Sequence, residues 1–130
     1  MAINPEYSFR AELVRVVDGD TFDLRVDLGF HCSITIRARL FGANAPELHN
    51  VKHGTPEHEA GIVAAKAAEA WFDSQKDALN IRTFKDRRTF GRWVALIEGY
   101  GGASLAEAMI RNGFARAADE DGNDIERRDA

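Results

Sequence analysis

The sequence predicts a mainly β protein of the α+β class, a five-stranded Greek-key barrel with the element order β-β-β-α-β-β-α. Apolar residues alternate with charged ones over residues 22–28, and apolar and polar residues alternate again over residues 34–40. A period of two is typical of a strand that buries one face. Gly29 marks a turn after the first stretch, so we expect the two to form a long hairpin. Several short strands with an intervening helix are typical of a closed barrel.

The expected strands cover residues 9–17, 22–28, 34–40, 78–84 and 93–97. Residues 42–56, between the third strand and the first helix, hold two glycines, two prolines, two asparagines and two histidines. This composition predicts a loop, and a loop of this length often has a functional role.

Two helices have recognisable start signals. Thr55 is an N-cap residue followed by Pro56, a residue that is favoured at the first helical position. Ser104 with Glu107 forms a capping box for a short second helix, and Gly113 is the residue type that ends one.

Charge is unevenly distributed along the 130 residues, a length that predicts one domain. The formal net charge is −4, and residues 119–130 account for all of it with six acids and two bases. Residues 82–92 carry five bases and one acid. We therefore divide the chain into a barrel domain, residues 1–118, and an acidic C-terminal tail or partial helix, residues 119–130. The tail is expected to be solvated, and the alternative is that it folds over the basic stretch and mimics phosphate.

The cellular compartment is indicated by the cysteine content and the N-terminus. Cys32 is a single cysteine, which excludes an internal disulfide, and its alternating surroundings predict a small structural side chain. The N-terminal residues show no secretory signal, and no apolar run is long enough to span a bilayer. The sequence therefore predicts a cytoplasmic protein with no membrane partner, and we expect a monomer.

Several side chains are suited to phosphodiester hydrolysis, which needs an attacking water, a base near it and cations around the developing charge. Asp20 is a hard oxygen donor of the kind that Ca²⁺ or Mg²⁺ prefers. Glu47 follows Pro46 in a stiffened loop, where a general base would be held in place. Arg39 and Arg92 offer planar, bidentate donors for phosphate oxygens.

Three segments occur in an order that is typical of one enzyme family: VDGDT at residues 17–21, RLFGANAPE at 39–47 and TFGRW at 89–93. On these segments the chain resembles the staphylococcal nuclease (thermonuclease-like) family over residues 13–118. The resemblance implies a barrel of the oligonucleotide-binding (OB) type. It also implies an endonuclease that cleaves DNA, RNA or both with Ca²⁺, with Mg²⁺ as the alternative ion, and leaves 3′-phosphate and 5′-hydroxyl ends.

The resemblance implies a role for each matching residue in the site loop. Asp20, Asn44 and the backbone carbonyl of Ala45 fall on the family's metal ligands, with Asn44 in place of an acid. Glu47 falls on the residue that acts as a base or orients the attacking water.

The resemblance also implies contacts to the substrate. Arg39 and Arg92 fall on the two phosphate-binding arginines and complete the expected catalytic set with Glu47. Further contacts to nucleic acid are expected from the basic stretch and the aromatic residue beside it: Arg82, Lys85, Arg87, Arg88 and Phe90. Phe90 stands where the family has a tyrosine, so one phenolic contact to phosphate is missing.

Two alternatives to a metal-dependent nuclease stay open. One is a catalytically weak or inactive module of the same fold that binds nucleic acid or another partner. Such family members usually lose the paired arginines and the glutamate, whereas Arg39, Arg92 and Glu47 are present here. The other is a barrel that only packs against other proteins, which the basic stretch at residues 82–92 disfavours. A zinc site among the histidines of residues 49–58 is a separate alternative, which their non-helical spacing disfavours.

Overall fold

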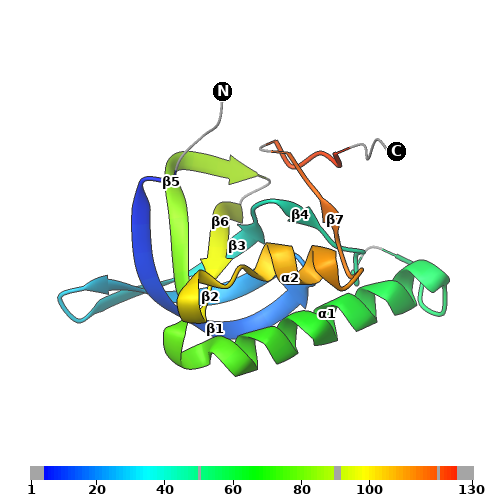
Figure 1. Ribbon diagram of the computed structural model, residues 1–130, viewed down its shortest axis with the longest axis horizontal. Helices are drawn as coiled ribbons and strands as arrows, with labels where there is room; N and C mark the ends of the chain where they lie inside the picture. Colours follow the sequence, from blue (N-terminus) through cyan, green and yellow to red (C-terminus); the bar gives the residue numbers. More distant parts are fainter. Residues whose placement is uncertain (1–4, 50, 90–91, 120, 126–130) are drawn as a thin grey trace.

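Five strands close into a barrel in the order β1-β2-β3-β6-β5 (Figure 1). The computed structural model describes residues 5–49, 51–89, 92–119 and 121–125, with the backbone alone at residues 86–89. The barrel strands are β1 (Tyr7–Asp18), β2 (Thr21–Gly29), β3 (Cys32–Leu40), β5 (Asn80–Thr89) and β6 (Arg92–Glu98). β3 and β6 run parallel and the other neighbouring pairs run antiparallel, as in an OB-type barrel. The predicted fold class is confirmed.

The alternating apolar side chains fill the barrel interior. Phe22 and Leu24 on β2 are fully buried, as are Ala38 on β3 and Ile81 on β5. Each large apolar side chain removed from water in this way contributes about 1.5–3 kcal/mol to stability. Near the β2–β3 turn the pattern no longer predicts burial, and Ile34 is 49% exposed because the hairpin extends beyond the barrel (Figure 1).

Helix α1 (Pro56–Gln75) runs beneath the barrel and packs along β1 (Figure 1). The Thr55 side chain caps the helix by accepting a hydrogen bond from the His58 N–H at 3.2 Å, at the predicted position. Buried alanines and Phe72 face the barrel, and the Phe72 ring meets the Phe22 ring edge-on with centroids 4.9 Å apart. The small alanine side chains let the helix approach the strands closely.

Helix α2 (Leu105–Arg111) begins at Ser104, whose side chain accepts a hydrogen bond from the Glu107 N–H at 3.2 Å. The predicted start of the second helix is therefore confirmed. Within the described residues, neither helix is long and apolar enough to cross a membrane.

The start of the predicted 42–56 loop is a strand. β4 (Ala43–Asn44) pairs antiparallel with β7 (Arg116–Ala117) in a small second sheet. Strands of two residues have no periodicity, so alternation in the sequence could not reveal them. Two 3₁₀ turns, η1 (Lys76–Ala78) and η2 (Tyr100–Gly102), precede β5 and α2.

The C-terminal residues fold back onto the body. Ala118 forms a bridge with Asp124, and the Ile125 N–H donates to the Ala117 carbonyl at 2.9 Å. In the described part of the predicted tail, residues 119 and 121–125, the backbone forms a turn and no helix. We call these residues the C-terminal turn.

Cys32 is exposed, so the prediction of a packed structural side chain is wrong. It follows the hairpin turn at Phe30 and His31, which have φ values of 56° and 60°. The strands have left the barrel wall at this point, so the alternation of the sequence has no core to face.

Candidate active site

Two carboxylates at the β1–β2 turn hold the segment that follows β4. The Asp20 carboxylate accepts a hydrogen bond from the Ala45 N–H at 2.8 Å. The Asp18 carboxylate accepts one from the Leu48 N–H, also at 2.8 Å. The site loop, residues 45–49, is therefore attached to the barrel near both of its ends.

Two glycines bring the site loop close to α1. A Cβ atom at Gly61 would lie 2.3 Å from the carbonyl oxygen of Glu47, and one at Gly19 would lie 2.8 Å from the Cβ of Ala64. Both distances are shorter than real Cβ contacts, so a side chain at position 61 would push the Glu47 backbone away. Sequence reasoning missed Gly61, although a glycine inside an alanine-rich helix is a signal for close packing.

Arg39 lies at the centre of the site with a side chain that is 15% exposed. Its guanidinium donates hydrogen bonds to the carbonyls of Leu40 at 3.1 Å and Ala43 at 2.9 Å, and to the Oδ1 atom of Asn44. The Asp20 carboxylate lies 3.5 Å from its Nη1 atom. These partners fix the plane of the guanidinium, so its other N–H groups keep one direction.

Arg92, the first residue of β6, reaches the same carboxylate through a hydroxyl. Its Nη1 atom donates to the Thr21 Oγ1 atom at 3.2 Å, and that hydroxyl donates to Asp20 at 3.1 Å. Thr21 is 2% exposed, so the connection is shielded from water. The structure therefore brings Asp20, Arg39 and Arg92 together, through a threonine whose part sequence reasoning missed.

Burial and charge act together on these side chains. Burial raises the pKa of the Asp20 carboxyl from its ordinary value, and the Arg39 guanidinium opposes that rise. Burial also lowers the pKa of Arg39. The Asp20 carboxylate opposes this shift, and the Arg92 guanidinium lowers the pKa further. The two guanidinium groups are thus close enough to repel each other, and a bound anion such as phosphate would relieve that repulsion.

Glu47 is exposed at the edge of a hollow of about 680 Å³. Asn44, Pro46 and Arg116 line the same hollow, which reaches from the site loop to β7. A carboxylate in this position can contact a water molecule or a substrate, so the geometry is compatible with the predicted role.

The Asn44 side chain connects Arg39 to the C-terminal turn. Its Nδ2 atom donates to the Gly122 carbonyl at 2.9 Å and to the Asp124 Oδ1 atom at 2.8 Å, while its Oδ1 atom accepts from Arg39. The Asp124 Oδ2 atom lies 3.3 Å from the Arg116 guanidinium. Sequence reasoning missed Gly122 and Asp124, because an acidic tail carries no local signal of where it docks.

The predicted metal ligands provide oxygen atoms, which suit a hard divalent cation. Asp20 offers a carboxylate, Ala45 a backbone carbonyl and Asn44 an amide oxygen, from two neighbouring segments. The Asp20 and Asn44 oxygens already accept hydrogen bonds, and each has a second lone pair. The three oxygen ligands therefore fit a hard divalent cation, and they carry a single negative charge, that of Asp20. The described residues hold no group of three His, Cys, Asp or Glu side chains that could bind a metal ion.

The histidine rings near the start of α1 face each other. The rings of His53 and His58 stack with centroids 4.3 Å apart and planes 17° from parallel. The lone pairs of the ring nitrogens lie in those planes, so they run side by side instead of converging on one ion. This geometry does not support the zinc alternative.

Among the residues expected to contact nucleic acid, Arg82 and Lys85 have described side chains. Arg82 lies 3.9 Å from Glu98 on β6, which offsets its charge, and Lys85 is exposed. The remaining three lie outside the described side chains: Arg87, Arg88 and Phe90.

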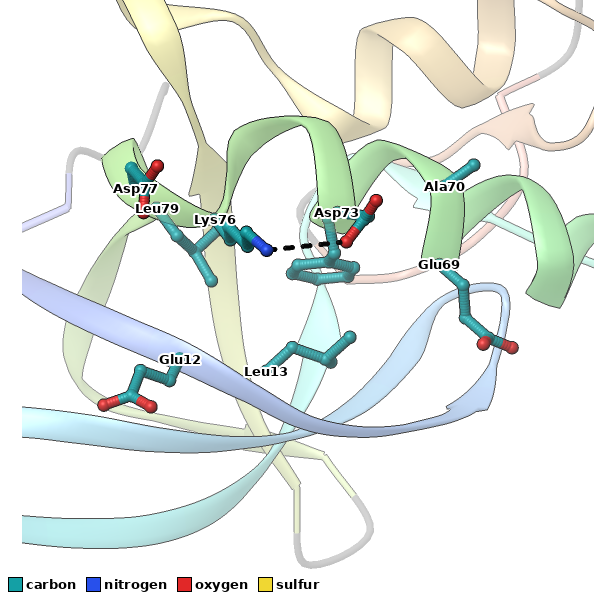
Figure 2. Close-up of a pocket in the computed structure, with 9 residues that line it drawn as sticks. Glu12, Leu13, Glu69, Ala70, Asp73, Lys76, Asp77 and Leu79 are labelled. Atoms are coloured by element: carbon teal, nitrogen blue, oxygen red, sulfur yellow. Dashed lines mark ion pairs between the residues drawn. The ribbon is translucent and has the colours of Figure 1, made fainter.

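A second hollow, the acidic groove, lies between α1 and β1 (Figure 2). Its volume of about 720 Å³ is close to that of the hollow beside Glu47. Four acids and a lysine line it: Glu12, Glu69, Asp73, Asp77 and Lys76. The Lys76 ammonium lies 4.0 Å from the Asp73 carboxylate, and both side chains are mostly exposed.

Comparison with known proteins adds no family assignment. No protein-family model matches the chain, and no curated protein matches it. The resemblance to the nucleases therefore rests on the three sequence segments.

Proposed function

We propose that the protein is a divalent-metal-dependent phosphodiesterase, an endonuclease that cleaves DNA, RNA or both. The main support is the approach of Arg39 and Arg92 to one buried carboxylate, directly and through Thr21. Planar guanidinium groups bind the non-bridging oxygens of a phosphodiester well.

In the proposed reaction the two arginines bind the phosphate and stabilise the charge that develops as water attacks phosphorus. A bond forms from the water oxygen to phosphorus, the bond to the 5′-oxygen breaks, and that oxygen takes up a proton. Because Leu40, Ala43 and Asn44 already hold Arg39, little reorganisation is needed when the substrate binds.

Glu47 orients the attacking water and accepts its proton in this proposal. Its carboxylate is exposed, whereas its backbone is packed against α1 at Gly61. The Glu47 carboxylate can therefore reach the substrate while its backbone stays in a fixed position. General base catalysis of this kind contributes about 10²–10⁴ in rate.

A divalent cation, Ca²⁺ or Mg²⁺, would be held by Asp20, Asn44 and the carbonyl of Ala45. When bound, it would neutralise charge on the phosphate oxygens. The protein contributes one carboxylate to this set, so we expect weak binding, with a Kd of about 10⁻⁴–10⁻³ M as in low-affinity calcium modules.

A binding module without catalysis is the second candidate function, and the packing of Arg39 favours it. Hydrogen bonds to two carbonyls and to Asn44, with an ion pair to Asp20, are also what a structural arginine would have. Such a module would bind nucleic acid through the remaining donors and leave it intact.

Cleavage of supercoiled plasmid and of single-stranded DNA and RNA, with Ca²⁺, Mg²⁺ or EDTA, separates the two candidates. We expect metal-dependent cleavage that falls by about 10²–10⁴ in Glu47→Gln, since one positioned base is lost. Glu57→Gln is the matched control, because this exposed acid lines the same hollow. Nucleic-acid binding without cleavage favours the module, and equal rates for Glu47→Gln and the wild type remove Glu47 from the mechanism.

A further inference from the structure

We infer that Asp124 is a positioning residue for Arg39 and that it acts through the Asn44 side chain. The inference rests on the proposed function and adds the C-terminal turn to the proposed site. Arg39 and Asp124 are joined by Asn44, which accepts from one and donates to the other. The turn thus takes part in placing the guanidinium that binds phosphate.

The surroundings of Asn44 fix which way its amide points. Gly122 and Asp124 offer acceptors at 2.9 and 2.8 Å on one side, and Arg39 offers a donor on the other. Rotating the amide by half a turn would place Oδ1 against two acceptors and the amino group against a guanidinium. While the turn is docked, the Asn44 oxygen must therefore face Arg39.

The C-terminal turn is itself well ordered by hydrogen bonds. The Asp119 carboxylate accepts from the N–H groups of Asp121 and Asn123, each at 2.9 Å. The Asp119 N–H also donates to the Asn123 carbonyl at 2.8 Å, and Gly122 has a φ of 85° that favours glycine. The turn can therefore present the Gly122 carbonyl and the Asp124 carboxylate as a fixed pair.

The turn is attached to the site by the small second sheet. Asn44 pairs with Arg116 across β4 and β7, and the Ala118 N–H donates to the Gly42 carbonyl at 2.9 Å. The Asp124 carboxylate uses its other oxygen to pair with Arg116 at 3.3 Å. The acidic turn thus meets the site at Asn44, and the Asp124 carboxylate also pairs with Arg116 on β7.

Two substitutions of Asp124 separate a hydrogen bond from a charge. Asp124→Asn and Asp124→Ala remove the same negative charge, but an asparagine at 124 keeps an acceptor for the Asn44 amide. Arg116 is 80% exposed and can turn away from the new amide. We expect kcat to fall about threefold to tenfold in Asp124→Ala, the size of one hydrogen bond, with KM nearly unchanged and with Asp124→Asn close to wild type.

Arg116→Gln is the control for the ion pair, because it removes the partner of Asp124 and leaves the Asn44 hydrogen bond in place. We expect kcat to stay within about twofold of wild type, as for most exposed ion pairs. Equal losses in Asp124→Asn and Asp124→Ala, or a loss in Arg116→Gln as large as that in Asp124→Ala, would overturn the positioning role.

A measurement without substrate tests the same link. The Nε–H signal of Arg39 in ¹⁵N spectra, assigned with Arg39→Lys, should shift in Asp124→Ala and stay near its wild-type position in Asp124→Asn. If the chemical shift of the Arg39 Nε–H signal is the same in both variants as in the wild type, the inference is overturned. If the wild type cleaves nothing while the signal still shifts as expected, the proposed function fails and the structural link stands.

Discussion

Two hollows in the described part of the protein are similar in size, and they lie next to charged groups that are held in different ways. The hollow beside Glu47 measures about 680 Å³ and the acidic groove about 720 Å³. In the acidic groove the charged side chains come from β1, α1 and η1, and Lys76 lies near Asp73 in an exposed pair (Figure 2). Such a pair contributes about 0–1 kcal/mol, and four acids would repel a polyanion.

The site differs from the acidic groove in how its charged groups are held. Arg39 is mostly buried and has an ion pair and several hydrogen bonds, and Thr21 links Arg92 to the same carboxylate. Charged groups that share buried partners keep a fixed arrangement, which binding and catalysis need. The two hollows have similar volumes, whereas the connections between charged side chains distinguish the site around Asp20 from the acidic groove.

Removal of the arginines should give the largest difference between the two regions. We expect Arg39→Ala and Arg92→Ala each to lower kcat by about 10²–10³, or about 2.7–4 kcal/mol of transition-state stabilisation. Lys76→Ala, which removes a cation from the acidic groove, is the control and should leave turnover unchanged. Full turnover in both arginine variants, together with a lower Tm, would assign the arginines a structural role.

Substitution of Asn44 tests the metal set and the C-terminal turn together. Asn44→Asp adds a charge to the predicted ligands and should tighten Ca²⁺ binding about tenfold in calorimetric titrations. It also places a carboxylate oxygen against Asp124, where an N–H now donates at 2.8 Å, so stability should fall by about 1–3 kcal/mol.

The double variant Asn44→Asp/Asp124→Asn exchanges donor and acceptor and keeps the net charge of the wild type. We expect it to recover most of the lost stability and to retain the tighter Ca²⁺ binding. If neither variant binds Ca²⁺ more tightly than the wild type, residue 44 does not face a metal.

Truncation after Ala118 should give a smaller, salt-dependent effect. It removes a net charge of −4 together with both tail acceptors of Asn44. We expect oligonucleotide binding, followed by fluorescence anisotropy, to tighten about threefold to tenfold at low salt. We also expect kcat to fall, because Arg39 is less well held.

The acidic groove provides a matched control for the truncation. Neutralising its four acids, as glutamine or asparagine, changes the net charge by the same four units. A similar gain in affinity from this variant would show that total charge matters and position does not. Unchanged affinity of the truncated chain at low salt would show that the tail is remote from the bound polymer.

The sequence predicted what local patterns determine. Alternation located the second and third barrel strands, the other three were predicted close to their observed places, and Thr55 and Ser104 marked both helix starts. The three segments indicated that Asp20, Arg39 and Arg92 belong together. The alternation was misleading at Ile34, which is 49% exposed, because burial depends on where the barrel ends as well as on strand period.

The parts of the site that the sequence did not predict depend on long-range contacts. The β4–β7 pair and the Asn44–Asp124 hydrogen bond join residues about 70–80 positions apart, and neither has a local signature. The sequence predicted a metal-ligand role for Asn44 from its neighbours in the chain, and it did not predict the contacts of the Asn44 side chain to the C-terminal turn. These contacts come from a segment that was expected to be solvated or to fold over the basic stretch, and neither expectation pointed to Asn44.

The hydrogen bonds from the site loop to Asp18 and Asp20 predict that backbone amide hydrogens exchange at two different rates between β4 and α1. The N–H groups of Ala45 and Leu48 point at carboxylates, so deuterium reaches them when the loop detaches from the barrel. Residues 51–54, further along, are mostly exposed. The part that carries Glu47 should therefore exchange more slowly than the part leading to α1, which should exchange as a surface loop. Glu47, the proposed base, would then keep its place while residues 51–54 move.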